Sequence, residues 1–465
     1  MNDIFVILQY CLGYKRDISN VVVRMDWRRL YTFASKQALL GFCIDCIERL
    51  GKEYSEELKK NPIERDLLMT WMGVAQQIRR QNMKVNVVAS KLYSMLREDG
   101  LRCCILKGQG NALMYPNAYS RNPGDIDVWV NASREQITEY AKKHFEIGED
   151  IRYHHLETSL DGVPVELHFF PGIMNNPVYN ARLQKWFKRN ADLQCSNVVS
   201  LSDGIGEIAI PTTAFNVIYQ LTHLYHHFFD EGIGMRQIID YFLVVNDFSK
   251  NVFLNNNFSN PSVSLSKGSS TFSPSPSSSG SGDVTAPSRC SEPLRSKDGG
   301  PSKVSPSYAG WDRLDGSGDM TSDSAGASAT VAHSSFVASS SSTALDVVQR
   351  ELKYLGLWKF AGAVMYVLHE ALGLPEEKMV APMDEKRGKL LLAEILNGGN
   401  FGKHFTKYGH FTQQGMAKKY FLKIWRNMHF VRYYPAEALS EPIFRTCHFF
   451  WRIKHKMFNS KEIKK

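Results

Sequence analysis

The chain has 465 residues, of which 43% are hydrophobic, so it is long enough for two or three globular domains. The apolar run near its start, IFVILQYCLG, is broken by Gln9 and Gly13 and follows no basic segment. Such a run is too short to span a bilayer and is unlike a signal peptide, so we expect a cytoplasmic protein with no membrane span. The eight cysteines are scattered, which favours reduced core thiols over a metal or redox role.

The net charge of +9 is concentrated at the end of the chain. Residues 403–465 carry fourteen Lys or Arg against three Glu, a net +11, and aromatic residues lie among them. The favoured interpretation is an amphipathic helix that covers a core while its charges reach solvent. Weak binding of nucleic acid, or attraction to an anionic lipid or substrate, is the alternative.

The first part of the chain, residues 1–95, is predicted to be helical because apolar residues recur at helical spacing with few breakers. Residues 96–210 then alternate between strand and helix patterns. The strand LRCCILKG ends at Gly108, and the short helix after it is stopped by Pro116. The strand DIDVWVN, a helix capped by Ser133 and the strand VPVELHFF follow in that order.

The rest of the chain is predicted to be helical around one segment of low complexity. Residues 211–250 and 344–465 carry long helical patterns rich in apolar residues. Residues 251–343 separate them, and 27 of the 81 residues from Ser262 to Ser342 are serine. This composition cannot bury enough apolar surface to offset the entropy of ordering, so we predict a disordered insertion in a loop of one helical domain.

The most informative motif is GDIDVWV, in which Asp125 and Asp127 are separated by one residue of an apolar run. On a strand both side chains point to one face, where two carboxylates repel each other unless a cation relieves them. Mg²⁺ accepts one or two carboxylates together with phosphate oxygens. The strand VPVELHFF supplies a third acid, Glu166. A strand that ends in glycine, a helix, the DxD strand and a further acidic strand together favour a nucleotidyltransferase site.

In nucleotidyl transfer an acceptor attacks the α-phosphorus of a nucleoside triphosphate and pyrophosphate leaves. Two Mg²⁺ ions can stabilise the entering and leaving oxygens, with Mn²⁺ as an alternative ion. Asp125 and Asp127 are predicted to bridge the metals. Glu166 is predicted to hold the metal that activates the acceptor hydroxyl, or to act as a base through it.

The phosphates are expected to lie near the end of the first strand. Gly108 lets the backbone approach them closely, and the helix after it offers free N–H groups. Lys107 or Arg121 is expected to neutralise the β- and γ-phosphates. Each of these residues also has a structural interpretation, such as a strand end for Gly108 or a surface ion pair for Arg121.

The runs LKG, YP, GDIDVWV and VELHFF, followed by HLYHHFFDEGIGMRQIIDYFLVV, resemble a bacterial family of uncharacterised nucleotidyltransferases in the polymerase-beta-like superfamily. The resemblance covers most of the chain outside the serine-rich segment. It implies an α+β fold: a small mixed sheet with helices as the catalytic core, between helical N- and C-terminal parts.

The same resemblance implies that the three acids are the metal ligands. It equates Gly108 with the glycine of the superfamily's Gly-Ser turn, although Gln109 stands where that turn has serine. Lys107 is characteristic of this branch and is expected to replace the missing contact. The predicted nucleotide-binding residues are therefore Lys107, Gly108, Gln109 and Arg121.

Further polar residues are candidates for the surroundings of the site. His168 shares a strand face with the third acid, and His223 and His227 lie one helical turn apart. Arg236 is expected either to close over the substrate or to form a helix ion pair with Asp240. Packing and hydrogen bonding between helices is the alternative for all but His168.

We therefore expect Mg²⁺-dependent transfer of a nucleoside monophosphate, AMP from ATP, to a hydroxyl acceptor on a small molecule, a protein or an RNA end. Three alternatives stay open. The first is a nucleotide-binding protein without catalysis. The reason for this alternative is Gln109, which stands where the superfamily has a serine. The second is a toxin-like enzyme that acts on tRNA through the basic end of the chain. The third is a metal-dependent phosphoesterase that uses the same acids.

Overall fold

The structure is a computed structural model that describes residues 1–14, 17–147, 152–258, 343–404 and 416–462. The serine-rich insertion predicted at residues 251–343 lies outside the described residues, except that the flanking helices reach Phe258 and the cap at Thr343.

The N-terminal helices are α1 (Asn2–Cys11), α2 (Ser19–Val22), α3 (Trp27–Lys36), α4 (Leu40–Glu53), α5 (Ser55–Lys60) and α6 (Arg65–Glu98). The middle of the chain forms β1 (Cys103–Leu106), α7 (Gly108–Ala112), β2 (Ile126–Val130), α8 (Arg134–His144), β3 (His155–Leu160), β4 (Val163–His168), α9 (Pro177–Ser196), β5 (Val198–Ser200) and β6 (Glu207–Ala209). The later helices are α10 (Thr213–Asp230), α11 (Met235–Phe258), α12 (Ala344–Tyr354), α13 (Trp358–Leu372), α14 (Glu385–Gly398), α15 (Met416–Met428) and α16 (Pro435–Glu462).

The central feature is a four-stranded mixed sheet in the order β1-β2-β4-β3. Strand β2 pairs antiparallel with β1 and parallel with β4, and β3 pairs antiparallel with β4. The α+β fold with a small mixed sheet is thus confirmed. Strand β3 was not predicted from the sequence, because its run HLETSL lies at the sheet edge and lacks a buried alternation. A turn at Asp161 and Gly162 joins β3 to β4, with positive φ at both residues.

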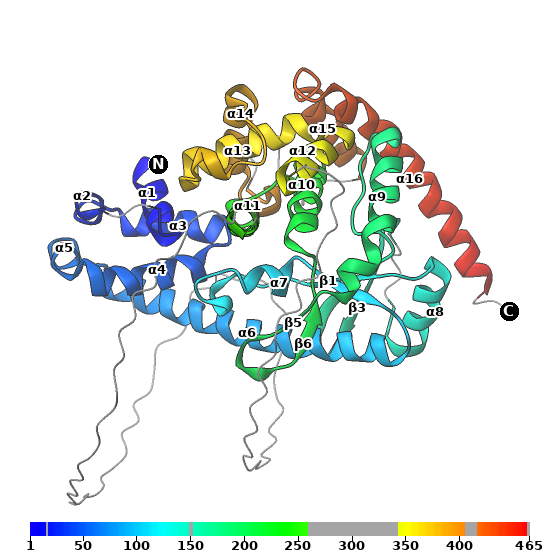
Figure 1. The fold of residues 1–465 in the computed structure, drawn as a ribbon, viewed down its shortest axis with the longest axis horizontal. Helices are drawn as coiled ribbons and strands as arrows, with labels where there is room; N and C mark the ends of the chain where they lie inside the picture. The colour runs from blue at the N-terminus through cyan, green and yellow to red at the C-terminus, as the bar shows by residue number, and fades with distance from the viewer. Residues whose placement is uncertain (15–16, 148–151, 259–342, 405–415, 463–465) are drawn as a thin grey trace, which may run out of the picture. The chain divides into compact units, whose positions relative to one another are not determined.

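Different helices cover the two faces of the sheet, with α6 along one face and α9 and α10 on the other (Figure 1). Ile126, Val128 and Val130 of β2 pack against α6 and α8. Trp129 points to the opposite face and stacks on Phe215 of α10 with ring centroids 6.0 Å apart. Because side chains alternate along a strand, the other residues of β2 that share the face of Trp129 point toward α10.

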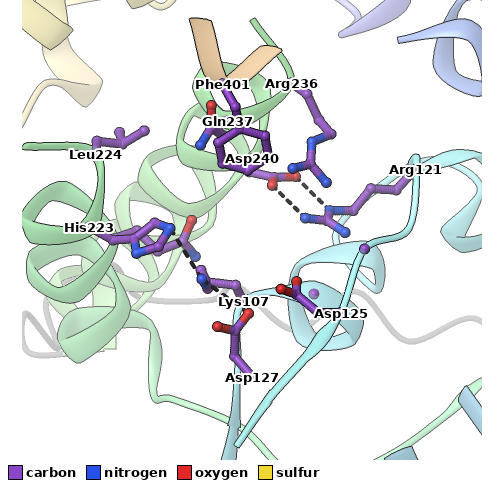
Figure 2. Close-up of a pocket in the computed structure, with 13 residues that line it drawn as sticks. Lys107, Arg121, Asp125, Asp127, His223, Leu224, Arg236, Gln237, Asp240 and Phe401 are labelled. Atoms are coloured by element: carbon purple, nitrogen blue, oxygen red, sulfur yellow. Dashed lines mark hydrogen bonds and ion pairs between the residues drawn. The ribbon is translucent and has the colours of Figure 1, made fainter. Parts of the chain in front are cut away.

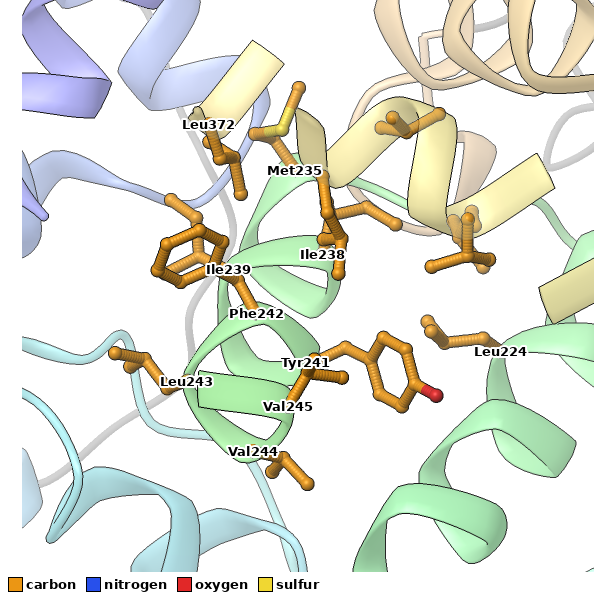
Figure 3. Packing of buried hydrophobic residues seen from close by; sticks show 14 of the residues in the cluster. Leu224, Met235, Ile238, Ile239, Tyr241, Phe242, Leu243, Val244, Val245 and Leu372 are labelled. Atoms are coloured by element: carbon orange, nitrogen blue, oxygen red, sulfur yellow. The ribbon is translucent and has the colours of Figure 1, made fainter. Parts of the chain in front are cut away.

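Helix α11 is enclosed by apolar side chains, including Leu224 of α10 and Leu372 of α13 (Figure 3). Successive residues of α11 are buried: Tyr241, Phe242 and Val244 are at most 1% exposed, and Leu243 is 8% exposed. A helix that is buried on all sides belongs to a core. The polar residues that α11 carries are therefore held on a rigid element.

Cys11 of α1 and Cys46 of α4 form a disulfide, with Cα atoms 5.3 Å apart. The prediction of reduced thiols throughout is wrong for this pair, because the packing of α1 on α4 brings together residues that are 35 positions apart in sequence. Cys43, which lies one helical turn before Cys46 on α4, is a free buried thiol. Within the described part of the chain, no helix combines the length and the hydrophobicity that crossing a bilayer requires.

Candidate active site

The three predicted acids lie together at one end of β2 and β4. Asp125 immediately precedes β2, and Asp127 stands opposite Glu166 in the parallel register of β2 with β4. His168 shares their face, and its Nε2 lies 3.0 Å from Asp127 Oδ1 and 3.2 Å from Glu166 Oε2. The fold thus brings Asp127, Glu166 and His168 into direct contact. Asp125 stands beside them, exposed, and makes no ion pair with a described residue.

Lys107 reaches the acids from the end of β1. Its backbone has a φ of 52° and a ψ of −127°, a conformation that costs a non-glycine residue about 1–3 kcal/mol and persists only where tertiary contacts hold it. Its Nζ lies 3.1 Å from Asp127 Oδ2 and 3.1 Å from His223 Nε2. Both carboxylate oxygens of Asp127 are therefore contacted, Oδ2 by Lys107 and Oδ1 by His168.

These contacts set the charges of the site. Burial opposes ionisation of Asp127, but Lys107 and His168 outweigh it and hold the pKa of Asp127 below its usual value. Burial likewise disfavours the imidazolium form of His168, yet its hydrogen bonds with Asp127 and Glu166 raise the pKa of His168 to about 9. The Asp127 carboxylate, followed by burial, raises the pKa of Asp125 to about 6. Mutual repulsion of this kind is what a bound divalent cation relieves.

Two cavities meet at the acids. The inner pocket has about 500 Å³ of empty space (Figure 2). It is lined by Lys107, Gly108, Arg121, Gly124, Asp125, Asp127, Gln220, His223, Leu224, Arg236, Gln237, Asp240 and Phe401.

The second cavity, here called the groove, is open and has about 3170 Å³ of empty space. Glu166 and His168 line it, together with residues near β3 and on α10, α15 and α16. The inner pocket and the groove share Lys107, Asp125, Asp127, His223 and Phe401. The two aspartates are thus part of the wall that both cavities have in common.

Comparison with known proteins places this geometry in a family. The profile of the family described as "Uncharacterised nucleotidyltransferase" matches residues 24–259, just over half of the chain. The chain belongs to this nucleotidyltransferase family. The resemblance seen in its motifs is thereby confirmed, although no curated protein matches the chain.

One solved structure is similar to part of this nucleotidyltransferase. It is an antigenic nucleotidyltransferase-like protein from Paracoccidioides brasiliensis, with 17% sequence identity and a TM-score of 0.24. The match covers 35% of this chain and 75% of the other. At that TM-score it supports no argument about the site.

The residues of the nucleotidyltransferase fit a divalent metal. Asp127, Glu166 and His168 each offer one ligand atom, and these atoms lie within 4.8 Å of one another. Asp125 adds an exposed carboxylate from the same strand end. Carboxylate oxygens suit Mg²⁺, and a metal bound by Asp127 takes over the charge balance that Lys107 and His168 now supply.

Arg121 lines the inner pocket, but its guanidinium is occupied. Its Nε and Nη2 donate to Oδ1 and Oδ2 of Asp240, each at 2.9 Å, and the Tyr115 hydroxyl donates to the same carboxylate at 2.7 Å. Arg121 and Asp240 are 5% and 4% exposed. This pairing argues against Arg121 as the ligand of the β- and γ-phosphates. The helix ion pair expected between Arg236 and Asp240 is not formed, because Asp240 binds Arg121 instead.

Helix α6 fixes the backbone on which Arg121 lies. The Asn82 side-chain amide donates to the carbonyl oxygens of Tyr119 and Arg121 at 2.8 and 2.7 Å. Asn82 is 1% exposed, so these hydrogen bonds are shielded from water. The loop that leads to Asp125 is thus anchored on the long helix beneath the sheet.

Arg236 is a cation of the inner pocket with no carboxylate within ion-pair distance among the described residues. It is 8% exposed, its Nη1 donates to the Asn122 carbonyl at 3.1 Å, and its Nε has no hydrogen-bond partner in the described structure. Burial, followed by the charge of Arg121, lowers its pKa. Figure 2 shows its guanidinium beside the Arg121–Asp240 pair, facing the cavity that Asp125 also lines. A buried cation without a counter-ion is costly, which favours an anion at this position.

The remaining predicted residues divide between the cavities and the core. Gly108 lines the inner pocket, and His223 lines both cavities. His227 also faces the groove, with its ring 4.2 Å from that of His223. Gln109 is 2% exposed and lines neither cavity, so its predicted contact with the nucleotide has no support.

Sequence reasoning missed His154 and His155, which line the groove beside the acids. His154 immediately precedes β3, and His155, its first residue, pairs with His168 across the antiparallel register. The signal was the short connection through Asp161 and Gly162, which folds β3 back on the strand of Glu166. Since β3 was not predicted, these two histidines could not be placed.

Proposed function

We propose that this nucleotidyltransferase transfers AMP from ATP to a hydroxyl acceptor in a Mg²⁺-dependent reaction that releases pyrophosphate. One observation carries the proposal: Asp125 and Asp127 line two cavities at once. The inner pocket contains the buried cation Arg236, which has no ion-pair partner among the described residues. The groove offers a separate approach to the same carboxylates.

We assign the inner pocket to the triphosphate of the donor. Lys107 and Arg236 face it, whereas the guanidinium of Arg121, which also lines it, is paired with Asp240. Charge-assisted contacts with phosphate are among the stronger hydrogen bonds. A side chain at Gly108 would meet only the Asp125 carbonyl oxygen, at 4.0 Å, so the backbone there is open to a ligand. Mg²⁺ held by Asp125, Asp127 and Glu166 would supply charge stabilisation at the α-phosphate.

We assign the groove to the acceptor. Glu166 and His168 line the groove and not the inner pocket, so an acceptor there lies beside the third acid. With about 3170 Å³ of empty space against about 500 Å³, the groove is much the larger of the two cavities. Its size therefore favours a large acceptor, such as a macromolecular end, over a small free alcohol.

Transfer to an RNA end is the second candidate function. Three exposed aromatic side chains line the groove: Phe421, Phe449 and Phe450, which are 69%, 55% and 63% exposed. Exposed aromatic rings of this kind are the surfaces on which unpaired bases stack. The charge of one nearby cation is already balanced, since Lys423 Nζ lies 2.8 Å from Asp230 Oδ1. The aromatic surface, rather than the basic charge, is what favours RNA.

Pyrophosphate release from each of the four nucleoside triphosphates tests the proposal. The purified protein is incubated with Mg²⁺ and an acceptor pool, either cell metabolites, total tRNA or a protein extract. We expect release with ATP above the other three, abolished by EDTA and restored by Mg²⁺ or Mn²⁺. Nucleotide labelled in the α-phosphate then identifies the acceptor pool.

The other outcomes separate the alternatives. Inorganic phosphate or free AMP without pyrophosphate would indicate a phosphoesterase. Saturable ATP binding with no pyrophosphate from any pool would contradict catalysis and support a nucleotide-binding protein. Transfer of label to tRNA alone would select the second candidate function.

Arg236→Gln is expected to weaken ATP binding about tenfold or more, because a charged hydrogen bond contributes about 1.5–3 kcal/mol. The melting temperature should stay within a few degrees, since no ion pair with a described residue is lost. Isothermal titration with ATP measures the change, and Arg80→Gln, on the exposed side of α6, is the matched control. Unchanged ATP affinity in Arg236→Gln would remove Arg236 from the donor site.

A further inference from the structure

Three imidazoles lie together on the wall of the groove. His154 immediately precedes β3, His155 begins it, and His168 ends β4. The ring centroid of His155 lies 4.3 Å from that of His154 and 5.1 Å from that of His168. One ring nitrogen from each residue lies within 4.8 Å of the others. Such a spacing is close to that of three ligands around a single ion.

The burial of the His155 ring is not explained by hydrogen bonding. His155 is 2% exposed, yet neither of its ring nitrogens makes a hydrogen bond of acceptable geometry with a described residue. Buried polar atoms are nearly always satisfied, so an imidazole of this kind indicates a missing ligand. All three histidines line the groove, which gives a metal ion a path to them.

A carboxylate lies beside two of the three imidazoles. Glu166 Oε2 lies 3.2 Å from His155 Nδ1 and 3.2 Å from His168 Nε2. The arrangement is therefore three nitrogens with one oxygen beside them, which differs from the all-oxygen surroundings that Mg²⁺ prefers. Imidazole is a preferred ligand of Zn²⁺, Co²⁺, Ni²⁺ and Cu²⁺.

We propose that His154, His155 and His168 bind a transition-metal ion of the Zn²⁺ class. This site faces the groove, whereas the carboxylates of Asp125 and Asp127 also face the inner pocket. Three protein nitrogens with room for a further ligand is the pattern of zinc sites that bind a substrate. The inference does not require nucleotidyl transfer, because metal binding is measured without turnover.

Cobalt binding to untagged protein, dialysed against EDTA, tests the site directly. We expect one Co²⁺ per chain, with visible absorption bands that report nitrogen ligands and resist millimolar Mg²⁺. His155→Gln and His154→Asn should each weaken Co²⁺ binding at least about tenfold, since even residues that only orient metal ligands contribute about 10–100-fold. His429→Gln, at an exposed position directly after α15, is the matched control.

Two results would overturn the inference: Co²⁺ affinity unchanged in both variants, or Co²⁺ displaced by millimolar Mg²⁺. Circular dichroism establishes whether each variant is folded, and His154, which is only half-buried, provides the gentler substitution. Pyrophosphate release by the same preparations keeps the two proposals distinguishable. Co²⁺ binding without nucleotidyl transfer contradicts only the proposed function. Nucleotidyl transfer without Co²⁺ binding contradicts only this site.

Discussion

Asp125→Asn is expected to lower the rate of pyrophosphate release at least about 100-fold while leaving the protein folded. Loss of a group that merely orients a metal ligand costs about 10–100-fold, so loss of a ligand carboxylate should cost at least as much. Asp125 is exposed and forms no ion pair with a described residue, so its replacement removes little else. Initial rates at saturating ATP and Mg²⁺, compared with wild type, measure the effect.

Although Asp125→Asn should lower the rate, it should leave the melting temperature unchanged or raise it. The pKa of Asp125 is raised from its usual 3.8 to about 6, chiefly by Asp127, so the folded protein loses stability as pH rises through this range. At pH 7.5 the Asn variant should therefore melt at or above the wild-type temperature, and the difference should vanish below pH 4. Asp161→Asn, at the β3–β4 turn, is the matched control for both measurements.

Two findings would count against this role of Asp125. A rate near that of wild type would show that its carboxylate holds no essential metal. A drop of many degrees in melting temperature at pH 7.5 would show that the side chain has a structural partner. Either result would leave Asp127 and Glu166 as the proposed metal-binding carboxylates.

Arg121→Ala is expected to lower the free energy of unfolding by about 3–5 kcal/mol, because it leaves the Asp240 carboxylate buried without its partner. Both residues are at most 5% exposed and are joined by two hydrogen bonds of 2.9 Å. Urea unfolding followed by circular dichroism measures the loss. ATP binding at a temperature where the variant is folded should change less than in Arg236→Gln.

The double variant Arg121→Met, Asp240→Leu is the control for this pair. Apolar residues of similar volume often replace a buried ion pair without loss of stability, so the double variant should recover most of the free energy. A loss below about 1 kcal/mol in Arg121→Ala would contradict the pairing. It would also indicate that Arg236, one helical turn from Asp240, can take the place of Arg121.

The local parts of the site could be predicted from the sequence. Alternation along GDIDVWV put Asp125 and Asp127 on one face, and the glycine after the first strand marked the end of β1. The third acid followed from a second strand-like run, and the structure places Glu166 opposite Asp127 in the β2–β4 register. These features depend on neighbours within a few residues, which a period of two residues is enough to reveal.

The partners of the cations could not be predicted, because they depend on contacts distant in sequence. Arg121 and Asp240 are 119 positions apart, and only the packing of α11 beside the loop before β2 joins them. Helical spacing suggested Arg236 as the partner of Asp240, but a bidentate guanidinium from the loop is the stronger partner. The disulfide between Cys11 and Cys46 escaped prediction for the same reason.

The wall that the inner pocket and the groove share has a stereochemical consequence. Under the proposed assignment, donor and acceptor would occupy the two cavities at the same time, each beside Asp125 and Asp127. A ternary complex of this kind needs no nucleotide covalently attached to the enzyme. In the proposed reaction a single displacement therefore inverts the configuration at the α-phosphorus, whereas a relay through an enzyme-bound nucleotide would retain it.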